Sequence, residues 1–127
     1  MNIRSREGDF PCLVVQAGLT LSRLCSDANW WIENSAGRVN IVLIIWICKD
    51  IKMLHLEKYI PGPVASANLA ATVVINCAAS STTVTGAPLL LEFDRVFDRQ
   101  ANPPLERDIV FNMQDLQNWG NEFWIGI

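Results

Sequence analysis

The hydrophobic pattern divides the chain into short apolar segments separated by turn-forming residues. Residues 10–17 (FPCLVVQA) form a β-prone apolar segment after a proline, which predicts a buried strand that stops at Gly18. From Thr20, whose hydroxyl is a candidate helix cap, apolar residues recur at helical spacing through Ile32. Gly37 is suited to the left-handed conformation that ends many helices. This part of the pattern therefore predicts a strand followed by a helix.

The next two segments predict the middle of a sheet. Residues 39–47 (VNIVLIIWI) are almost wholly apolar and rich in β-branched side chains, as expected of a strand covered on both faces. Residues 52–59 alternate in character, which predicts an antiparallel neighbour joined by a short hairpin. The alternation places Met53, His55, Glu57 and Tyr59 on one face and Leu54, Leu56 and Lys58 on the other.

The remaining residues contain weaker strand signals and a final helix. Strand candidates are residues 71–76 (ATVVIN), 81–85 (STTVT) and 88–93 (PLLLEF), and the pattern leaves the strand order of residues 61–90 open. Asn112 is a candidate cap for a closing amphipathic helix, on which Leu116, Trp119 and Phe123 share one face.

These elements predict an α/β fold, a mixed α+β sandwich. We expect two helices on a core sheet of about four to six strands, with a helix after the first strand and a C-terminal helix. Residues 1–9 are polar and charged and predict a flexible leader before a single domain at residues 10–127.

Composition narrows the function classes. The 127 residues carry a net charge of −3, which gives no broad cationic field for nucleic acid. The longest apolar run has eight residues, at 41–48, and a spanning helix needs about 20, so no membrane segment is expected. The first twenty residues lack a signal-peptide core, which predicts an intracellular protein, cytoplasmic or nuclear. The four cysteines have no CxxC spacing and are interpreted as free core thiols rather than disulfides or metal ligands.

Five tryptophans are many for this length. Trp31, Trp46 and Trp119 fall on apolar faces, which predicts core positions. Trp30 diverges from Trp31 by about 100° on a helix and should be exposed, as a ligand or partner contact. Trp124 is a weaker contact candidate.

One polar pair suggests chemistry. His55 and Glu57 stand two residues apart on a predicted strand, so they share a face and suit a base with its orienting carboxylate. A satisfied polar pair without catalytic function is the favoured interpretation. The sequence contains no GxSxG elbow, GxGxxG, P-loop or HExxH motif.

Several segments together carry a family resemblance. They are PCLVVQAG at 11–18, Asp27-Ala28, Trp31, Ser35, Gly37, residues 39–47, LHLEK at 54–58, residues 90–97, Pro103 and Asp108-Ile109-Val110, with a closing helix that ends in Trp. This series resembles fungal proteins with a restriction-endonuclease-like, PD-(D/E)XK-type domain. The resemblance spans most of residues 9–124 and implies a nuclease-like sheet.

The residues that would perform nuclease chemistry depart from the family. In such nucleases, acids on adjacent strands bind hard cations and a lysine aligns the attacking water. Here Gln16 stands at the carboxylate position, Gly18 at the lysine position two further on, and Asn40 replaces a second-strand lysine, although Arg38 is close by. The family's upstream hairpin and helix are also missing, and Asp9 alone is expected to be solvated. The resemblance therefore implies a degenerate site with no metal and no cofactor.

Three hypotheses follow. The first is a non-catalytic binding or self-association module, a homo-oligomer because the missing hairpin uncovers a sheet edge or apolar face, with a protein or an apolar small molecule as further partner. The second is a small-molecule enzyme of fungal metabolism, whose former nuclease cleft is an apolar pocket. Its lining would be Gln16, Trp30, Trp46, His55 and Glu57, with Gln16, His55 and Glu57 as the candidate catalytic groups. A metal-dependent nuclease is the least favoured.

Overall fold

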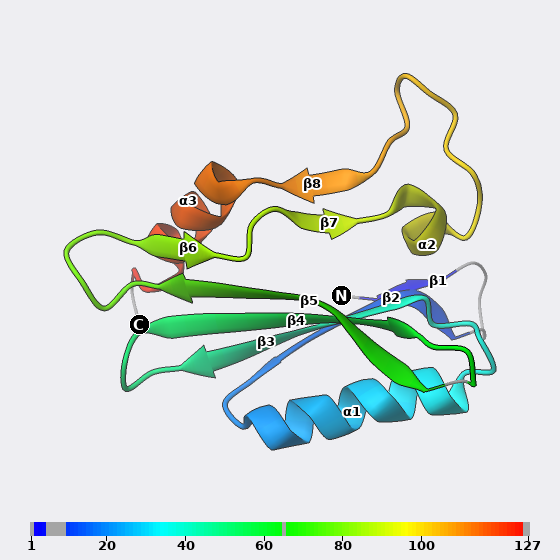
Figure 1. The fold of residues 1–127 in the computed structure, drawn as a ribbon, viewed down its shortest axis with the longest axis horizontal. Helices are drawn as coiled ribbons and strands as arrows, with labels where there is room; N and C mark the ends of the chain where they lie inside the picture. Colours follow the sequence, from blue (N-terminus) through cyan, green and yellow to red (C-terminus); the bar gives the residue numbers. More distant parts are fainter. Residues whose placement is uncertain (1, 5–9, 65, 126–127) are drawn as a thin grey trace.

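Six strands form one mixed sheet in the order of the sequence (Figure 1). The fold comes from a computed structural model that describes residues 2–4, 10–64 and 66–125. The strands are β1 (Asn2–Arg4), β2 (Pro11–Gly18), β3 (Ile41–Cys48), β4 (Met53–Pro61), β5 (Ala67–Asn76) and β6 (Thr83–Thr85). β2 and β3 are parallel, and every other neighbouring pair is antiparallel. The strand order of residues 61–90, which the sequence left open, is thus sequential through β6.

The helix α1 (Leu21–Asn34) connects the parallel pair and covers one face of the sheet (Figure 1). Two consecutive parallel strands need such a crossover, because the chain must return to the end of the sheet where the first strand began, and a tight turn joins only antiparallel strands. Leu24, Ala28 and Ile32 form its buried stripe, as the helical spacing predicted. Thr20 is the N-cap residue, but its side chain makes no capping hydrogen bond, so that part of the prediction is wrong.

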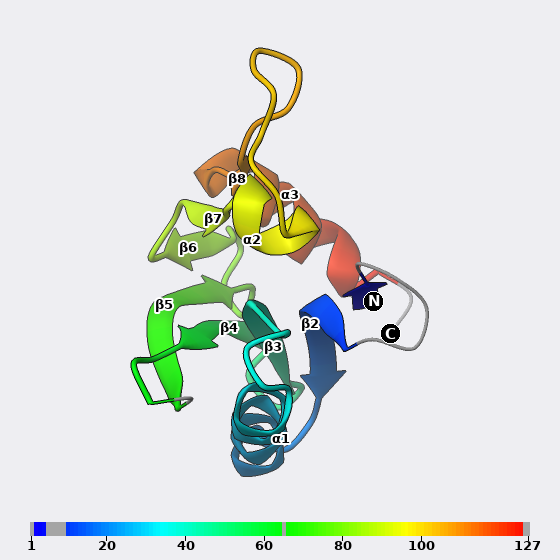
Figure 2. The same ribbon diagram turned by 90° about the vertical axis from the view of Figure 1, so that its right-hand side faces the viewer.

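The other face of the sheet is covered by the C-terminal third of the chain (Figure 2). This layer contains β7 (Leu89–Leu91), α2 (Phe93–Phe97), β8 (Ile109–Phe111) and α3 (Met113–Phe123). β7 and β8 pair as a separate antiparallel sheet of two strands. Asn112 caps α3 as predicted, because its side chain accepts from the Asp115 amide at 2.8 Å and the Asp115 carboxylate accepts from the Asn112 amide at 3.0 Å.

The mixed α+β sandwich, the helix after the first predicted strand and the C-terminal helix are confirmed. The structure differs from the predicted elements in three places. α2 is a third, short helix, the strand predicted at residues 88–93 belongs to the small second sheet, and β8 carried no strand prediction. β1 lies within the segment expected as a flexible leader, and the rest of that segment, including Asp9, lies outside the described residues.

Side-chain alternation along β3 and β4 divides the interior into two apolar layers. Val42 and Ile44 pack against α1, whereas Leu43, Leu54 and Leu56 pack against the C-terminal layer. β3 is buried from both sides because it lies in the middle of the sheet, as its continuous apolar sequence predicted.

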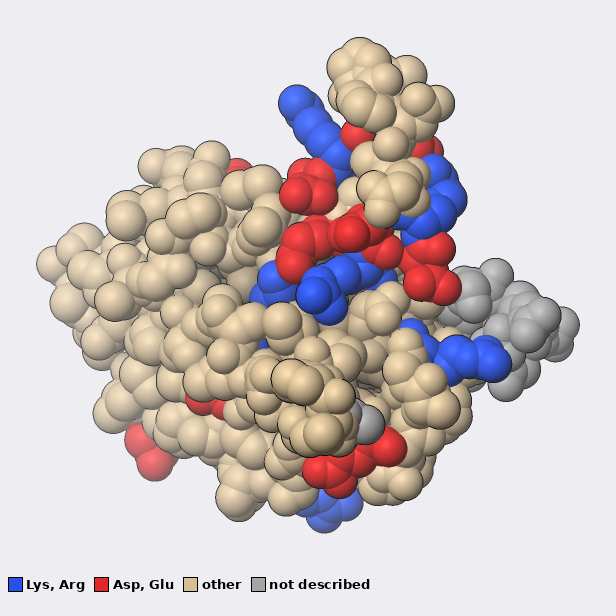
Figure 3. Space-filling model, turned by 45° about the vertical axis from the view of Figure 1, so that its right-hand side comes forward, with Lys and Arg blue, Asp and Glu red and all other residues tan. Residues whose placement is uncertain are grey.

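A loop of residues 98–108 projects from the C-terminal layer (Figures 1 and 2). Its two limbs are joined by Arg99, whose guanidinium donates to both carboxylate oxygens of Glu106 at 2.8 and 2.6 Å. These hydrogen bonds, followed by one from the Asn102 amide, lower the pKa of Glu106 to about 2. Acidic and basic side chains gather at the base of this loop (Figure 3). In the segment that precedes the loop, Glu92 bonds to both Lys58 and Arg95. The Arg99–Glu106 ion pair therefore joins the two limbs of the loop.

Two further observations concern disulfide bonds and membrane-spanning helices. Within the described residues the four cysteines form no disulfide, and Cys12 is buried whereas the other three are half-buried. Within the described residues, no helix combines the length and apolarity needed to cross a bilayer.

Candidate functional site

Four of the five side chains expected to line a pocket lie on the sheet face under α1. Gln16 on β2, Trp46 on β3, and His55 and Glu57 on β4 share this face because each is an alternate position of its strand. The register places them close together, since Gln16 is opposite Ile44, which is in turn opposite Glu57. Parallel pairing of β2 with β3 and the β3–β4 hairpin therefore assemble a polar cluster from three strands.

Glu57 is the centre of this cluster. Its Oε1 accepts from the Tyr59 hydroxyl at 2.6 Å and lies 3.6 Å from Cys25 Sγ, and its Oε2 is 2.8 Å from His55 Nε2. Burial raises the pKa of the Glu57 carboxyl, but the hydrogen bonds from Tyr59, His55 and Cys25 outweigh it, and the net pKa is lowered. Since an ionised carboxylate only accepts, His55 Nε2 is the donor. Burial, followed by the bonds with Cys25 and Glu57, raises the pKa of Tyr59.

Gln16 connects the sheet to α1. Its Oε1 accepts from Trp31 Nε1 at 2.9 Å, and its Nε2 donates to Asp27 Oδ2 at 3.4 Å. Both ends of the amide are therefore occupied by α1 side chains. An indole N–H needs an acceptor when it is half-buried, and an amide oxygen supplies one without adding charge.

Trp31, Trp46 and Trp119, which were predicted in the core, are half-buried instead. Trp46 donates from Nε1 to the Leu19 carbonyl at 3.1 Å and meets the His55 ring edge-on at 5.9 Å. Trp30 is 52% exposed, as predicted, and contacts the rings of Phe10 and Trp31 rather than the polar cluster. Trp124, the weaker contact candidate, is half-buried.

The groups that would serve metal-dependent hydrolysis are not brought together. Lys58 lies on the opposite face of β4 and bonds to Glu92. Asn40, where the resemblance implied a lysine, donates to the Arg95 carbonyl of α2 at 3.0 Å. Gly18 ends β2 beside Leu24. Across residues 2–4, 10–64 and 66–125, no three His, Cys, Asp or Glu side chains are placed to hold a metal ion. The described part of the polar cluster thus has one well-bonded carboxylate and a histidine, and no cation site.

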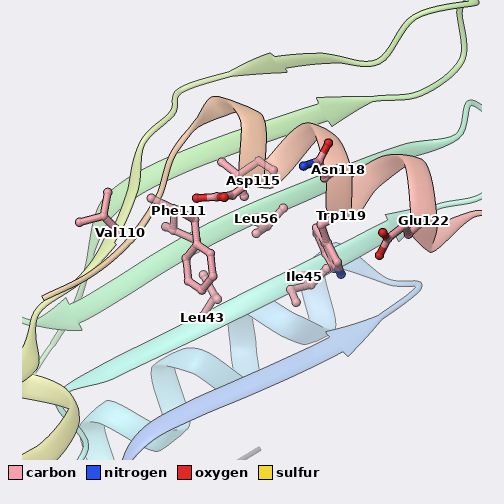
Figure 4. Close-up of a pocket in the computed structure, with 11 residues that line it drawn as sticks. Leu43, Ile45, Leu56, Val110, Phe111, Asp115, Asn118, Trp119 and Glu122 are labelled. Atoms are coloured by element: carbon pink, nitrogen blue, oxygen red, sulfur yellow. The ribbon is translucent and has the colours of Figure 1, made fainter.

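A cavity of about 560 Å³ lies on the opposite face, between β3, β4, β8 and α3 (Figure 4). Trp119 extends from α3 toward Ile45, and Phe111 extends from β8 toward Leu43 (Figure 4). The apolar part of its wall consists of Leu43, Ile45, Leu56, Leu89, Val110, Phe111, Leu116 and Trp119. None of the five residues expected to line a pocket contributes to this wall.

The rim of the cavity is acidic. Asp115, Asn118 and Glu122 line it from successive turns of α3. The Asp115 carboxylate accepts from the Asn112 amide, and Asn118 Oδ1 accepts from Gln114. No described side chain bonds to the Glu122 carboxylate, and no Lys, Arg or His lines the cavity.

Sequence reasoning missed this cavity because its walls look like ordinary core. Alternation correctly assigned Leu56 to the face opposite His55 and Glu57, and the helical spacing correctly turned Leu116 and Trp119 toward the sheet. Trp119, however, is half-buried and lines the cavity instead of filling a closed core. One signal of a solvent-accessible site was present in the sequence. Asp115 and Glu122 stand four residues before and three residues after Trp119, so the three share one helix face.

No family model, curated protein or solved structure matches this chain.

Proposed function

We propose that this domain is a non-catalytic binding module that holds an apolar ligand in the cavity beside α3. The observation that carries the proposal is the cavity itself. Its volume of about 560 Å³ falls within the roughly 300–1,000 Å³ of small-molecule sites. Its walls are aliphatic and aromatic, and its polar groups stand only at the rim. A ligand that removes this apolar surface from water lowers the free energy of the system, which favours binding.

The polar cluster under α1 supports binding over catalysis. Both oxygens of Glu57 and both ends of the Gln16 amide already have protein partners. A reacting group would have to displace these bonds, each of which stabilises a half-buried polar atom. The resemblance to PD-(D/E)XK domains fits a scaffold that has kept its sheet while Gln16, Gly18 and Asn40 replaced the catalytic side chains. This argument also speaks against a small-molecule enzyme built on the five expected residues, because none of them lines the cavity.

Titration with octanol tests the proposal by nuclear magnetic resonance. We expect shifts centred on Leu56 and the Trp119 indole, because both line the cavity. Ile45→Phe should fill part of the cavity and weaken binding about tenfold, the loss of roughly two buried methylenes. Leu90→Phe is the matched control, since Leu90 is 36% exposed on β7 and does not line the cavity. Absence of shifts at saturating octanol, or shifts centred elsewhere, would overturn the proposal.

Self-association is a second candidate, and one specific observation favours it. β6 pairs with β5 only at Val74–Asn76, and within the described part of the chain no strand pairs with the outer edge of residues 67–71. Leu69 is 53% exposed on this segment. At the other end of the sheet β1 pairs with Pro11–Val14, so part of the edge expected to be uncovered is occupied.

An open strand edge can pair with the same edge of a second copy. Light scattering at micromolar concentration should then give the mass of a dimer, and Leu69→Lys should give a monomer because a lysine on the edge opposes pairing. If the unaltered protein is a monomer, the self-association proposal is wrong and the cavity proposal is unaffected.

A further inference from the structure

We infer that the ligand of the α3 cavity carries a positive charge beside its apolar body, as a primary alkylammonium does. This inference rests on the proposed binding function and adds the chemical class of the ligand. It comes from the arrangement of three side chains on one face of α3. Asp115, Trp119 and Glu122 follow one another at spacings of four and three residues, which places them in a row along the helix.

The row combines two carboxylates with one aromatic ring at the mouth of the cavity. Figure 4 shows Asp115 and Glu122 on either side of Trp119 along α3, with the indole reaching toward the sheet. All three line the cavity. A ligand whose chain lies on Leu43, Ile45 and Leu56 would therefore have its head group beside Trp119 and the two acids.

No described basic side chain stands at this mouth. The cavity lining contains no Lys, Arg or His, and the described residues offer the Glu122 carboxylate no hydrogen bond or ion pair. Among the described residues, the Asp115 carboxylate accepts from the backbone amide of Asn112 at the start of α3, where the helix dipole favours an acid but leaves its formal charge in place. By contrast, Glu92, Glu106 and Glu57 are each bonded to a basic side chain.

A cationic head group fits this mouth on two grounds. An ammonium is attracted by both carboxylates and also by the face of the Trp119 ring, since an indole binds cations through its π electrons. A carboxylate or phosphate head group would meet like charge from Asp115 and Glu122. Because both acids are exposed, water and salt screen them, and each should change affinity about twofold to fivefold.

Three probes with the same alkyl chain test the inference: octylamine, octanol and octanoate. At low ionic strength and neutral pH, we expect octylamine to bind about tenfold tighter than octanoate, with octanol between them. Glu122→Gln should weaken octylamine about threefold and leave octanol unchanged, because it removes charge without changing shape. Glu33→Gln is the matched control, since Glu33 is an exposed acid on α1, across the sheet from the cavity.

The outcomes separate this inference from the function on which it rests. If none of the three probes shifts the resonances of Leu56 and Trp119, the binding function itself is wrong. If all three bind there with equal affinity, or octanoate binds most tightly, the function stands and the cationic ligand is wrong. If Glu33→Gln weakens octylamine as much as Glu122→Gln does, the effect belongs to net charge and the inference is overturned.

Discussion

Glu57 and Lys58 are neighbours in β4, and their side chains leave opposite faces of the sheet. The Glu57 carboxylate bonds to His55 and Tyr59 under α1, whereas the Lys58 ammonium bonds to Glu92 beside α2. Strand geometry forces this separation, because successive side chains point to opposite faces. Glu57 and Lys58 therefore contribute to different layers of the fold and do not share a site.

Magnesium or manganese ions should leave thermal stability unchanged. A ligand that binds only the folded state raises the melting temperature. Both oxygens of Glu57 are occupied by protein partners, and the described residues hold no group of three His, Cys, Asp or Glu placed as ligands. Differential scanning calorimetry with millimolar metal, against the same protein in a chelator, should show a difference below about one degree. A rise of several degrees would show that a metal site has been kept.

Tyr59→Phe should destabilise the domain by about 1–2 kcal/mol at neutral pH, because it removes a hydrogen bond to the Glu57 carboxylate. The ring stays, so packing changes little. Urea unfolding measures the loss. Glu57→Gln with Tyr59→Phe completes a double-mutant cycle that isolates the coupling between the two groups. A loss within a few tenths of a kcal/mol would show that water replaces the hydroxyl at no cost.

Stability should also fall as the solution is made acidic. The pKa of Glu57 is lowered from its ordinary 4.5 in the folded state, so its contribution is fully present above that value. It is lost as the pH falls through the lower folded pKa, where the folded carboxylate takes up its proton. The pKa of Glu92 is lowered too, because burial, which raises it, is outweighed by the hydrogen bond from Lys58, a backbone hydrogen bond and the charges of Lys58 and Arg95 together. Glu57→Gln should therefore flatten the acid limb of the stability curve in urea unfolding between neutral and acidic pH. An unchanged acid limb would contradict the assignment.

The bond between Lys58 and Glu92 should be a large single contribution to attachment of the C-terminal layer. The Lys58 side chain is 7% exposed, and Glu92 also bonds to Arg95. Glu92→Gln leaves the ammonium without its carboxylate and should cost about 3 kcal/mol. The double variant Lys58→Met, Glu92→Leu should recover part of that loss, because a buried apolar pair needs no charge compensation. If the double variant is as unstable as Glu92→Gln, the loss arises from packing and not from the unpaired charge.

Much of this fold could be predicted from local pattern, because each element has a local physical cause. The apolar run of β3 requires cover on both sides, the alternation in β4 requires two different faces, and the Asn112 cap fixes the start of α3. β8 was not predicted because it has three residues, all exposed, and among the described strands it pairs with the equally short β7. Such a strand is defined by its partner rather than by its own sequence.

The candidate site was only half predictable for a related reason. The polar cluster follows from strand register, so His55 and Glu57 could be placed on one face in advance. The cavity depends on the distance between α3 and the sheet, and no periodicity encodes that distance. Trp119 has the same apolar neighbours in sequence whether its ring fills a closed core or borders a space.

Gly86 and Gly37 provide a matched pair that separates backbone strain from steric clash. Both have positive φ, at 89° and 81°, so alanine is strained at either position. At Gly86 an added Cβ would lie 2.1 Å from the Thr72 carbonyl oxygen of β5, whereas at Gly37 nothing lies within 4 Å. Gly37→Ala should cost about 1 kcal/mol, from the left-handed backbone alone. Gly86→Ala should cost at least about 3 kcal/mol, because the chain leading to β7 must also move away from β5. Urea unfolding of both variants measures the difference. Equal losses would show that the approach of Gly86 to β5 relaxes freely, and that the C-terminal layer is not fixed at this point.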